Sequence, residues 1–232
     1  NLNKKTEWVL GISYFDVTEG NLKKDDGVYG DPSDPFGPYF SESLFSSKFS
    51  SESFSLFGNL DYFINKSLKF SIGARWENYE SQYVDSLGEL FNPSDKMSGG
   101  KISINKNLSD SSNIFLSIAR GFNQGGFNLN LGLAPASKNS NLYYDPEFLT
   151  NYEIGFNSQL FNKMMNVSAV IFYSDRDDQQ VLISTQVDPM DPNTFSFLTQ
   201  NAAEGINKGV ELNLDMELSE SVYFFSRFGL LQ

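Results

Sequence analysis

Segments in which apolar and polar side chains alternate, each about ten residues long, are the feature that most limits how this sequence can fold. In one of them, Leu68, Phe70, Ile72, Ala74 and Trp76 alternate with lysine, serine, glycine, arginine and glutamate. Successive side chains of a β-strand point to opposite faces of its sheet. This segment therefore has one apolar face and one polar face, and so does the segment before it, residues 54–62.

Very short and long connections alternate between these segments. Only residues 65–67 separate the two segments just described, whereas a polar stretch from Glu80 to Lys96 follows the second one. Tight turns at one end of the strands and long loops at the other are typical of a transmembrane β-barrel. A strand of ~10 residues at ~3.3 Å each, tilted by ~40°, spans roughly 25 Å, which is the height of the apolar band of such a barrel.

The alternation predicts an all-β antiparallel meander of about nine strands. The expected strands are residues 7–17, 54–62, 68–76, 98–107, 112–122, 151–160, 165–173, 210–218 and 222–232. From Thr18 to Ser43 the chain is rich in glycine and proline, so we expect an irregular loop there. Bacterial barrels have even strand numbers and the last strand still runs at Gln232, so residues 1–232 are expected to be an internal part of a larger barrel.

The composition excludes several classes of function. The net charge of −12 argues against nucleic acid as a partner, because few cations are present to neutralise phosphates. The chain has no cysteine and no histidine. Thiol and histidine catalysis and zinc sites built from those residues are therefore unavailable, and we expect neither an enzyme nor a cofactor.

Aromatic residues make up 15% of the chain. A transmembrane barrel places such residues in girdles at the two membrane interfaces. The residues expected in these girdles, because they lie near strand ends, are Trp8, Trp76, Tyr79, Tyr152 and Tyr173.

Four parts of the sequence, in the same order along the chain, resemble the barrel domain of TonB-dependent outer-membrane receptors. The hairpin of residues 54–76 is similar to the family's "ALFGQ…GLRY" hairpin, and Phe115–Asn128 resembles its "SRGF…GGFN" strand end. Tyr144–Gly155 resembles the segment "Y.PE…NYE.G", and Gly209–Leu212 resembles a strand start "GVE". The resemblance implies an outer-membrane location and a barrel of about 22 strands, with short periplasmic turns and long extracellular loops.

The same resemblance implies TonB-energised uptake of a scarce nutrient, such as a ferric siderophore, with no chemical change in the substrate. The implied partners are a small-molecule ligand, outer-membrane lipid and lipopolysaccharide. A plug domain and, through it, the TonB complex are also implied. We expect the plug and the C-terminal strands of the barrel to lie outside this chain.

Two groups of residues are candidates for function. The polar face is expected to form the lumen wall and to contact the plug through Arg75, Glu77, Glu153, Asn157, Glu211 and Asn213. Binding residues concentrate on loops, and the residues in or beside a long outer loop that we expect to contact ligand are Phe122, Asn123, Gln124, Asn128, Tyr143 and Tyr144. Asp175, Asp177, Asp178, Asp188 and Asp191 offer oxygen ligands, but their spacing matches no calcium loop, so no metal site is expected.

Two alternative functions stay open on the sequence alone. A passive porin-type channel needs the same strands and no plug. A soluble β-sandwich that binds carbohydrate would have strands of about 5–6 residues, which is roughly half the length expected here. Apolar faces packed against each other in a core would favour the sandwich.

Overall fold

The computed structural model describes residues 5–30, 37–128, 142–186, 190, 195–202 and 204–232. These residues form strands and turns. None of them belongs to a helix long and apolar enough to cross a membrane.

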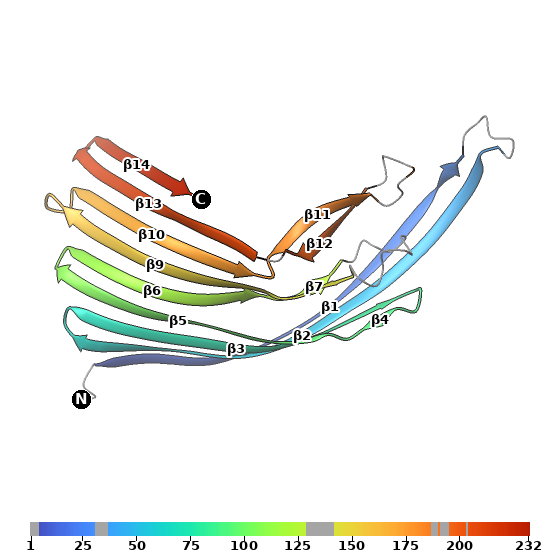
Figure 1. Cartoon of the computed structure of the whole chain (residues 1–232), viewed down its shortest axis with the longest axis horizontal. Helices are drawn as coiled ribbons and strands as arrows, with labels where there is room; N and C mark the ends of the chain where they lie inside the picture. Colours follow the sequence, from blue (N-terminus) through green and yellow to red (C-terminus); the bar gives the residue numbers. More distant parts are fainter. Residues whose placement is uncertain (1–4, 31–36, 129–141, 187–189, 191–194, 203) are drawn as a thin grey trace.

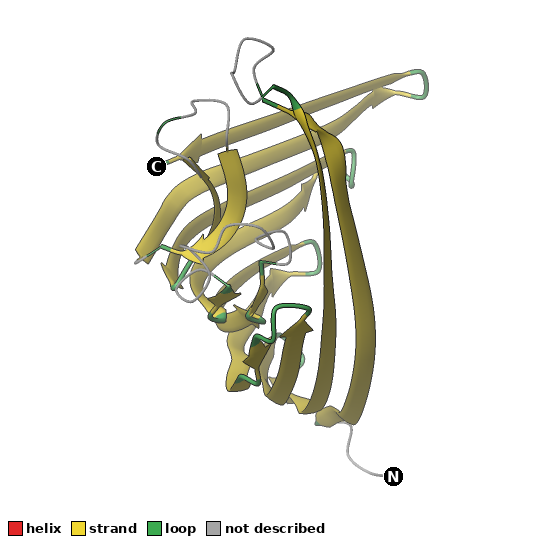
Figure 2. Cartoon of the chain, turned by 90° about the vertical axis from the view of Figure 1, so that its right-hand side faces the viewer, coloured by secondary structure: helices red, strands yellow, loops and turns green. Residues whose placement is uncertain are grey.

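Nine long strands of the described chain form one curved antiparallel sheet (Figures 1 and 2). They are β1 (Thr6–Tyr29), β2 (Tyr39–Asn65), β3 (Leu68–Asp85), β5 (Ser94–Ser109), β6 (Ser112–Asn123), β9 (Glu147–Leu160), β10 (Met165–Asp177), β13 (Glu204–Ser219) and β14 (Val222–Leu231). Their order in the sheet is their order in the chain, so each pairs with its sequence neighbours. Within the described chain β1 and β14 are the two edges. The predicted meander of nine strands is confirmed, and the total of about 22 strands stays a prediction.

Several strands extend further than the sequence predicted. β1 and β2 pair without interruption from Thr6 opposite Tyr62 to Tyr29 opposite Tyr39. The prediction of an irregular loop was therefore wrong for residues 18–29 and 39–43. The two strands satisfy each other's backbone hydrogen bonds through this stretch, and its prolines all lie between residues 32 and 38, where none interrupts the ladder.

Short strands that the sequence did not predict occupy the long connections. β4 (Leu90–Phe91) pairs with β3. β7 (Gly126–Phe127) pairs with β8 (Tyr143–Tyr144) in the connection from β6 to β9. β11 (Gln180–Gln186) and β12 (Phe195–Asn201) form a seven-residue ladder between β10 and β13. All of them lie at the end of the sheet opposite the tight turns (Figure 1).

Local hydrogen bonds and backbone conformation close the tight turns. Between β2 and β3, Oδ1 of Asn65 accepts hydrogen bonds of 2.9 Å from both the backbone N–H and the hydroxyl of Ser67. An asparagine that bonds its own backbone two residues on replaces part of the turn's hydrogen bonding. Between β9 and β10, Phe161, Asn162 and Lys163 all adopt positive φ angles, of 51°, 55° and 73°.

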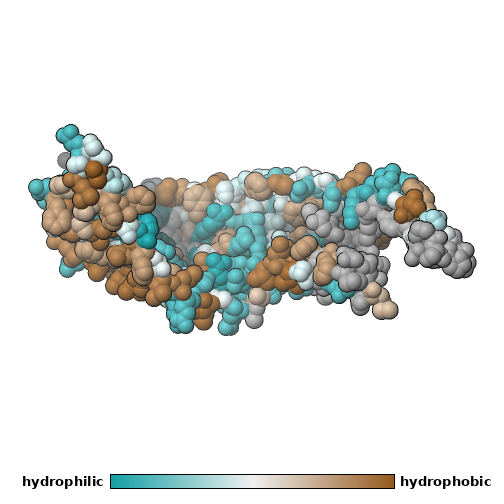
Figure 3. All heavy atoms as spheres, turned by 90° about the horizontal axis from the view of Figure 1, so that it is seen from above, coloured by the Kyte–Doolittle hydropathy of each residue, from teal (hydrophilic) through white to brown (hydrophobic). Residues whose placement is uncertain are grey.

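The two faces of the sheet differ in both polarity and crowding. On the apolar face Ile72, Ile118 and Leu212 are 41%, 51% and 43% exposed, whereas Ser55 and Glu77 on the polar face are 0% and 1% exposed. Side chains converge on the concave face of a curved sheet and diverge on its convex face. The polar face is therefore the inner, concave one, and the apolar face is the outer, convex one. Figure 3 shows apolar side chains gathered over the half that carries the tight turns.

The expected aromatic girdle is only partly found on the outer face. Trp8, Trp76, Tyr152 and Tyr173 are 71%, 42%, 45% and 39% exposed there, and the last two rings lie 6.2 Å apart. Tyr79 is 4% exposed. Tyr79 is two residues after Glu77 in β3, so both side chains lie on the inner face. The assignment of Tyr79 to the girdle was therefore wrong.

Phenylalanines on the inner face cover glycines of the neighbouring strands. Gly11 is paired with Phe57, and Gly155 is paired with Phe115. A Cβ atom at either glycine would overlap the phenylalanine ring. These pairs shield otherwise bare backbone and help to hold the register of the strands.

Candidate functional site

All six residues expected on the lumen wall lie on the inner face. The pairing register places Glu153 beside Ser117 and Phe172, and Asn157 beside Asn113. Ser117 donates a 3.1 Å hydrogen bond to Glu153, and Asn157 donates one of 3.3 Å to Asn113. Glu211 and Asn213 continue the same face on β13.

A polar hollow of about 650 Å³ lies on this face near the tight turns. Asn113, Asn157, Asn213 and Asp215 are among the residues that line it. Amide, hydroxyl and carboxylate groups make this a surface for water or polar partners. It is consistent with the expected lumen wall.

Glu77 is a buried carboxylate that joins three elements. One of its oxygens accepts a 2.8 Å hydrogen bond from the Ser53 hydroxyl and a short one from the Gln124 amide. The other accepts from Nε and Nη2 of Arg75 at 3.0 and 2.5 Å. A buried charge is tolerated when it is paired and hydrogen-bonded, and Glu77 thereby holds Gln124, just beyond β6, against β3.

Phe122 lies close to Arg75, which is on the inner face. Strict alternation along β6 would instead place Phe122 on the outer face. The pairing of β5 with β6 ends at Gly100 opposite Arg120, and beyond this point β6 pairs only with β9. A Cβ atom at Gly99 would overlap the carbonyl oxygen of Arg120, so glycine permits the close approach of the two strands there. The Phe122 ring centroid lies 5.9 Å from Cζ of Arg75.

Arg120 itself remains on the outer face, where its Cζ lies 4.6 Å from the centroid of the Phe148 ring. No irregularity in the register interrupts its pairing with Thr150. Its side chain therefore lies over an aromatic ring, a favourable environment for a guanidinium group.

An aromatic cluster connects β7 and β8 to the extensions of β2 and β3. The Phe127 ring lies 5.4 Å from Tyr83 in a stacked arrangement, 5.6 Å from Phe49 and 5.3 Å from Tyr143. Tyr143 donates a short hydrogen bond to Asp95. Burial and this carboxylate raise the pKa of the Tyr143 phenol above its usual range, so the group is a neutral donor at physiological pH.

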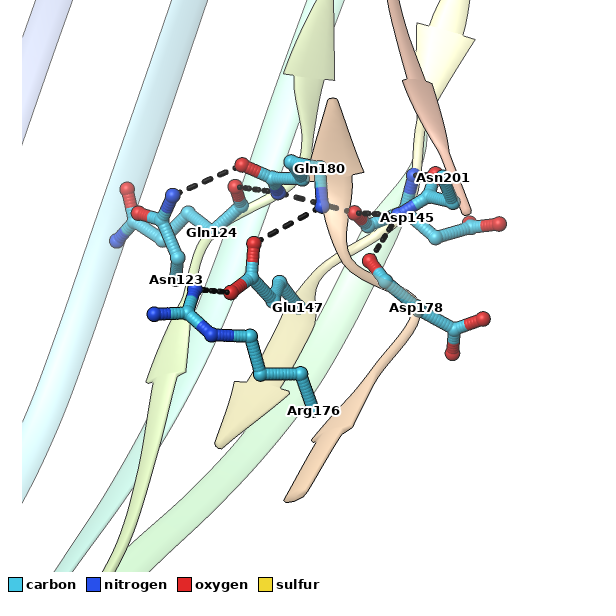
Figure 4. A network of polar contacts seen from close by, with 8 residues as sticks. All are labelled: Asn123, Gln124, Asp145, Glu147, Arg176, Asp178, Gln180 and Asn201. Carbon is cyan, nitrogen blue, oxygen red and sulfur yellow. Dashed lines mark hydrogen bonds and ion pairs between the residues drawn. The ribbon is translucent and has the colours of Figure 1, made fainter. Parts of the chain in front are cut away.

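A second set of contacts joins the ends of β6, β9 and β10 to the β11–β12 hairpin (Figure 4). Glu147 is its centre: Oε1 accepts a 2.6 Å hydrogen bond from Arg176, and Oε2 accepts one of 2.9 Å from the backbone N–H of Gln180. The side chain of Gln180 donates to the carbonyl oxygens of Gln124 at 2.8 Å and Asp145 at 3.1 Å, and it accepts a 2.8 Å bond from Asn123.

Two asparagine amides complete the attachment of the hairpin. Asn128 donates a 2.8 Å bond to the carbonyl oxygen of Thr199 and accepts a 2.7 Å bond from its N–H, as a backbone neighbour in a ladder would do. Asn201 bonds both the N–H and the carbonyl oxygen of Asp145, at 2.7 and 2.9 Å. The connections from β6 to β9 and from β10 to β13 are therefore joined to each other above the inner face.

The six residues expected to contact ligand all lie in this region. Four of them, Asn123, Gln124, Asn128 and Tyr143, donate the hydrogen bonds described above to other parts of the chain. Tyr144 is half-buried with its hydroxyl packed against Gly126. Phe122 is also half-buried. Contact of these residues with a ligand stays a prediction.

Reasoning from the sequence missed Glu147, Gln180 and Asn201. Glu147 belongs to the segment that resembles "Y.PE…NYE.G", so that motif was a signal for it. Gln180 and Asn201 lie in a region without alternation strong enough to predict the hairpin that carries them. In the described part of the chain no three acidic side chains come together as a metal site; Asp188 and Asp191 lie outside the described residues.

Comparisons with known proteins agree with this architecture. A family model described as "TonB dependent receptor-like, beta-barrel" matches residues 1–231. The ferric yersiniabactin uptake receptor FyuA from Yersinia pestis is similar in fold, with a TM-score of 0.69 and 18% identity, over 100% of this chain and 33% of that one. The comparison with curated proteins found no match.

Two further solved structures share the fold. The siderophore receptor PiuA from Acinetobacter baumannii has a TM-score of 0.64 and 18% identity, over 99% of this chain and 36% of that one. The copper transporter OprC has a TM-score of 0.58 and 14% identity, over 94% and 36%. The chain thus spans about a third of the length of the solved structures it matches.

Proposed function

The chain belongs to the family of TonB-dependent receptor-like β-barrels, and from this premise we propose that it forms part of a receptor that takes up a scarce nutrient with energy relayed by TonB. Its location is the outer membrane, as for the family. The tight turns would then face the periplasm and the β7–β8 and β11–β12 hairpins the outside.

One observation supports a closed barrel in particular. The described sheet carries an exposed apolar outer face, its polar inner face is crowded around Ser55 and Glu77, and its edge strands β1 and β14 each pair on one side only. A membrane barrel has no free edge. We propose that further strands of the same receptor pair with both edges, and that a plug domain fills the lumen and contacts Arg75, Glu77, Glu153, Asn157, Glu211 and Asn213.

The proposed substrate is a ferric siderophore. Support comes from the fold shared with FyuA and PiuA, whose names describe siderophore receptors. OprC, named a copper transporter, shares the fold as well, so fold alone does not select the substrate. The proposed contact residues are Phe122, Asn123, Gln124, Asn128, Tyr143 and Tyr144, of which the four that donate hydrogen bonds within the chain would act mainly by holding the outer hairpins in place.

Transport tests this proposal directly. Iron-starved cells that express the receptor containing this chain should accumulate ⁵⁵Fe from a siderophore mixture, and accumulation should stop when TonB is deleted or the proton-motive force is collapsed. The matched control is the same strain without the receptor. Uptake that continues without TonB, together with steady conductance in a planar bilayer, would instead identify a passive porin-type channel.

A further inference from the structure

Two cations lie diagonally across neighbouring strands of the inner face. Gly73 of β3 pairs with Lys101 of β5, and Arg75 pairs with Gly99. Diagonal neighbours of this kind have Cα atoms roughly 7–8 Å apart. The other two corners are glycines, which carry no side chains of their own; the Asn59 side chain borders Gly73 and the Phe122 ring borders Gly99.

The next strand, β6, also carries small residues at this part of the inner face. Ala119 of β6 pairs with Lys101, and Gly121 follows two residues later. Above these small residues is a hollow of about 560 Å³, and its lining includes Phe122 and the charged residues Arg75, Glu77, Lys101 and Arg120. This volume lies within the range of small-molecule sites.

The hollow has an uncompensated positive charge. Arg75 uses Nε and Nη2 to bind Glu77, so these two charges balance. Lys101 is exposed and has no hydrogen bond or ion pair with any described residue. This local positive charge favours an anion over a cation, in opposition to the chain's net charge of −12.

Phe122 adds an apolar wall. Its ring lies beside Arg75 and 6.5 Å from the Phe148 ring, centroid to centroid. A flat ligand against Phe122 would place an acidic group within reach of Nη1 of Arg75 and the ammonium group of Lys101.

We propose that this hollow, at the loop end of the lumen wall, binds an aromatic carboxylate, with the carboxylate between Arg75 and Lys101 and the ring against Phe122, so that Arg75 borders both this ligand and the proposed plug. The inference rests on the proposed function, for which it names the chemical class of the ligand or of the ligand's recognised end. Lys101 supplies the net charge, Nη1 of Arg75 supplies a further donor, the glycines supply the space, and the phenylalanine selects for an aromatic ring over a bare anion.

Binding by the purified receptor in detergent tests this proposal. In ¹⁹F NMR titrations, 4-(trifluoromethyl)benzoate should bind about tenfold more tightly than the neutral 4-(trifluoromethyl)benzamide, because charged hydrogen bonds are lost in the amide. Lys101→Gln should weaken benzoate binding by about tenfold, and Phe122→Leu should weaken it several-fold. Lys106→Gln is the matched control, because Lys106 is exposed on the outer face of the same strand, and it should leave binding unchanged.

Each contrary result overturns a defined part of the proposal. Equal binding of benzoate by the Lys101→Gln variant and the unmodified receptor would remove the cationic site. Displacement of benzoate by inorganic phosphate at equal concentration would remove the requirement for a ring. Failure of TonB-dependent uptake would refute the proposed function but would leave these binding constants unaltered, so the two failures are distinguishable.

Discussion

At the scale of single residues, Glu77 illustrates how the inner face is stabilised. Its carboxylate is 1% exposed and has donors from β2, from β3 and from the segment after β6. The Arg75 side chain is 48% exposed, so solvent screens the ion pair and the hydrogen bonds contribute the more certain part of the stabilisation. Removing the carboxylate leaves four donor groups, on Ser53, Arg75 and Gln124, without their acceptor.

We therefore predict that Glu77→Ala lowers the free energy of unfolding by about 2–3 kcal/mol. Urea titration of the receptor in lipid vesicles, followed by the electrophoretic shift between folded and unfolded forms, measures this change. Glu80→Ala is the control, since Glu80 is exposed on the same strand and accepts one hydrogen bond, from Asn78. If both variants lose the same free energy of unfolding, the buried contacts of Glu77 add nothing to stability.

At the scale of elements, the β11–β12 hairpin depends on side chains of other strands. Its ladder pairs only its own two strands, and an isolated two-stranded hairpin is marginally stable in water. Glu147, Asn128 and Asn201 attach it to the ends of β9, β7 and β8. The hairpin and the β7–β8 connection should consequently move together.

Loss of Glu147 should release this attachment. We expect Glu147→Ala to lower the free energy of local opening of β11 and β12 by about 2 kcal/mol, which is roughly thirtyfold faster amide hydrogen exchange in these strands. Exchange in β9 and β10 should change little, because their ladders remain. Glu204→Ala is the control, because Glu204 is an exposed acid at the same end of the sheet. If amide exchange in β11 and β12 is unchanged in the Glu147→Ala variant, Glu147 does not attach the hairpin.

At the scale of the whole molecule, the apolar side chains have no protein core to enter. Among the described residues, the buried apolar side chains that cluster together are Tyr83, Phe127 and Leu142 at the loop end, while the outer face stays exposed along its length. Lipid is the solvent that such a face requires. Two sheets packed face to face, which the β-sandwich alternative required, are not found among the described strands.

A charged side chain introduced on the outer face should accordingly lower the stability of the folded receptor, because lipid surrounds that face. Leu116, 52% exposed and paired with Ile104 and Ile154, is a suitable position. Leu116→Arg should destabilise the folded receptor in vesicles by about 2–4 kcal/mol, whereas Asn105→Arg on the inner face should cost less than about 1 kcal/mol. The vesicle urea titration described for Glu77 measures both, and equal costs would argue against contact of this face with lipid.

Much of the sheet was predictable because alternation is a local property. The parity of Leu68, Phe70 and Ile72 determines which face is apolar without knowledge of any partner strand, and the tight turns lie where residues such as Asn65 can close them. Nine strands, their order and the polarity of their faces follow from these signals. The residues expected on the lumen wall lie on the inner face for the same reason.

Only the tertiary structure decided where strands end and what lies above the inner face. Residues 18–29 remain in a strand because β2 continues beside them, and a single strand's composition does not reveal its partner's length. Phe122 and Gln124 reach the inner side because β6 leaves β5 at Gly99 and Gly100, which cancels the parity rule. Glu147, Gln180 and Asn201 come together although they are distant in sequence. Hydrogen bonds between loops depend on where whole strands lie, and they produce no alternation pattern in the sequence from which they could be predicted.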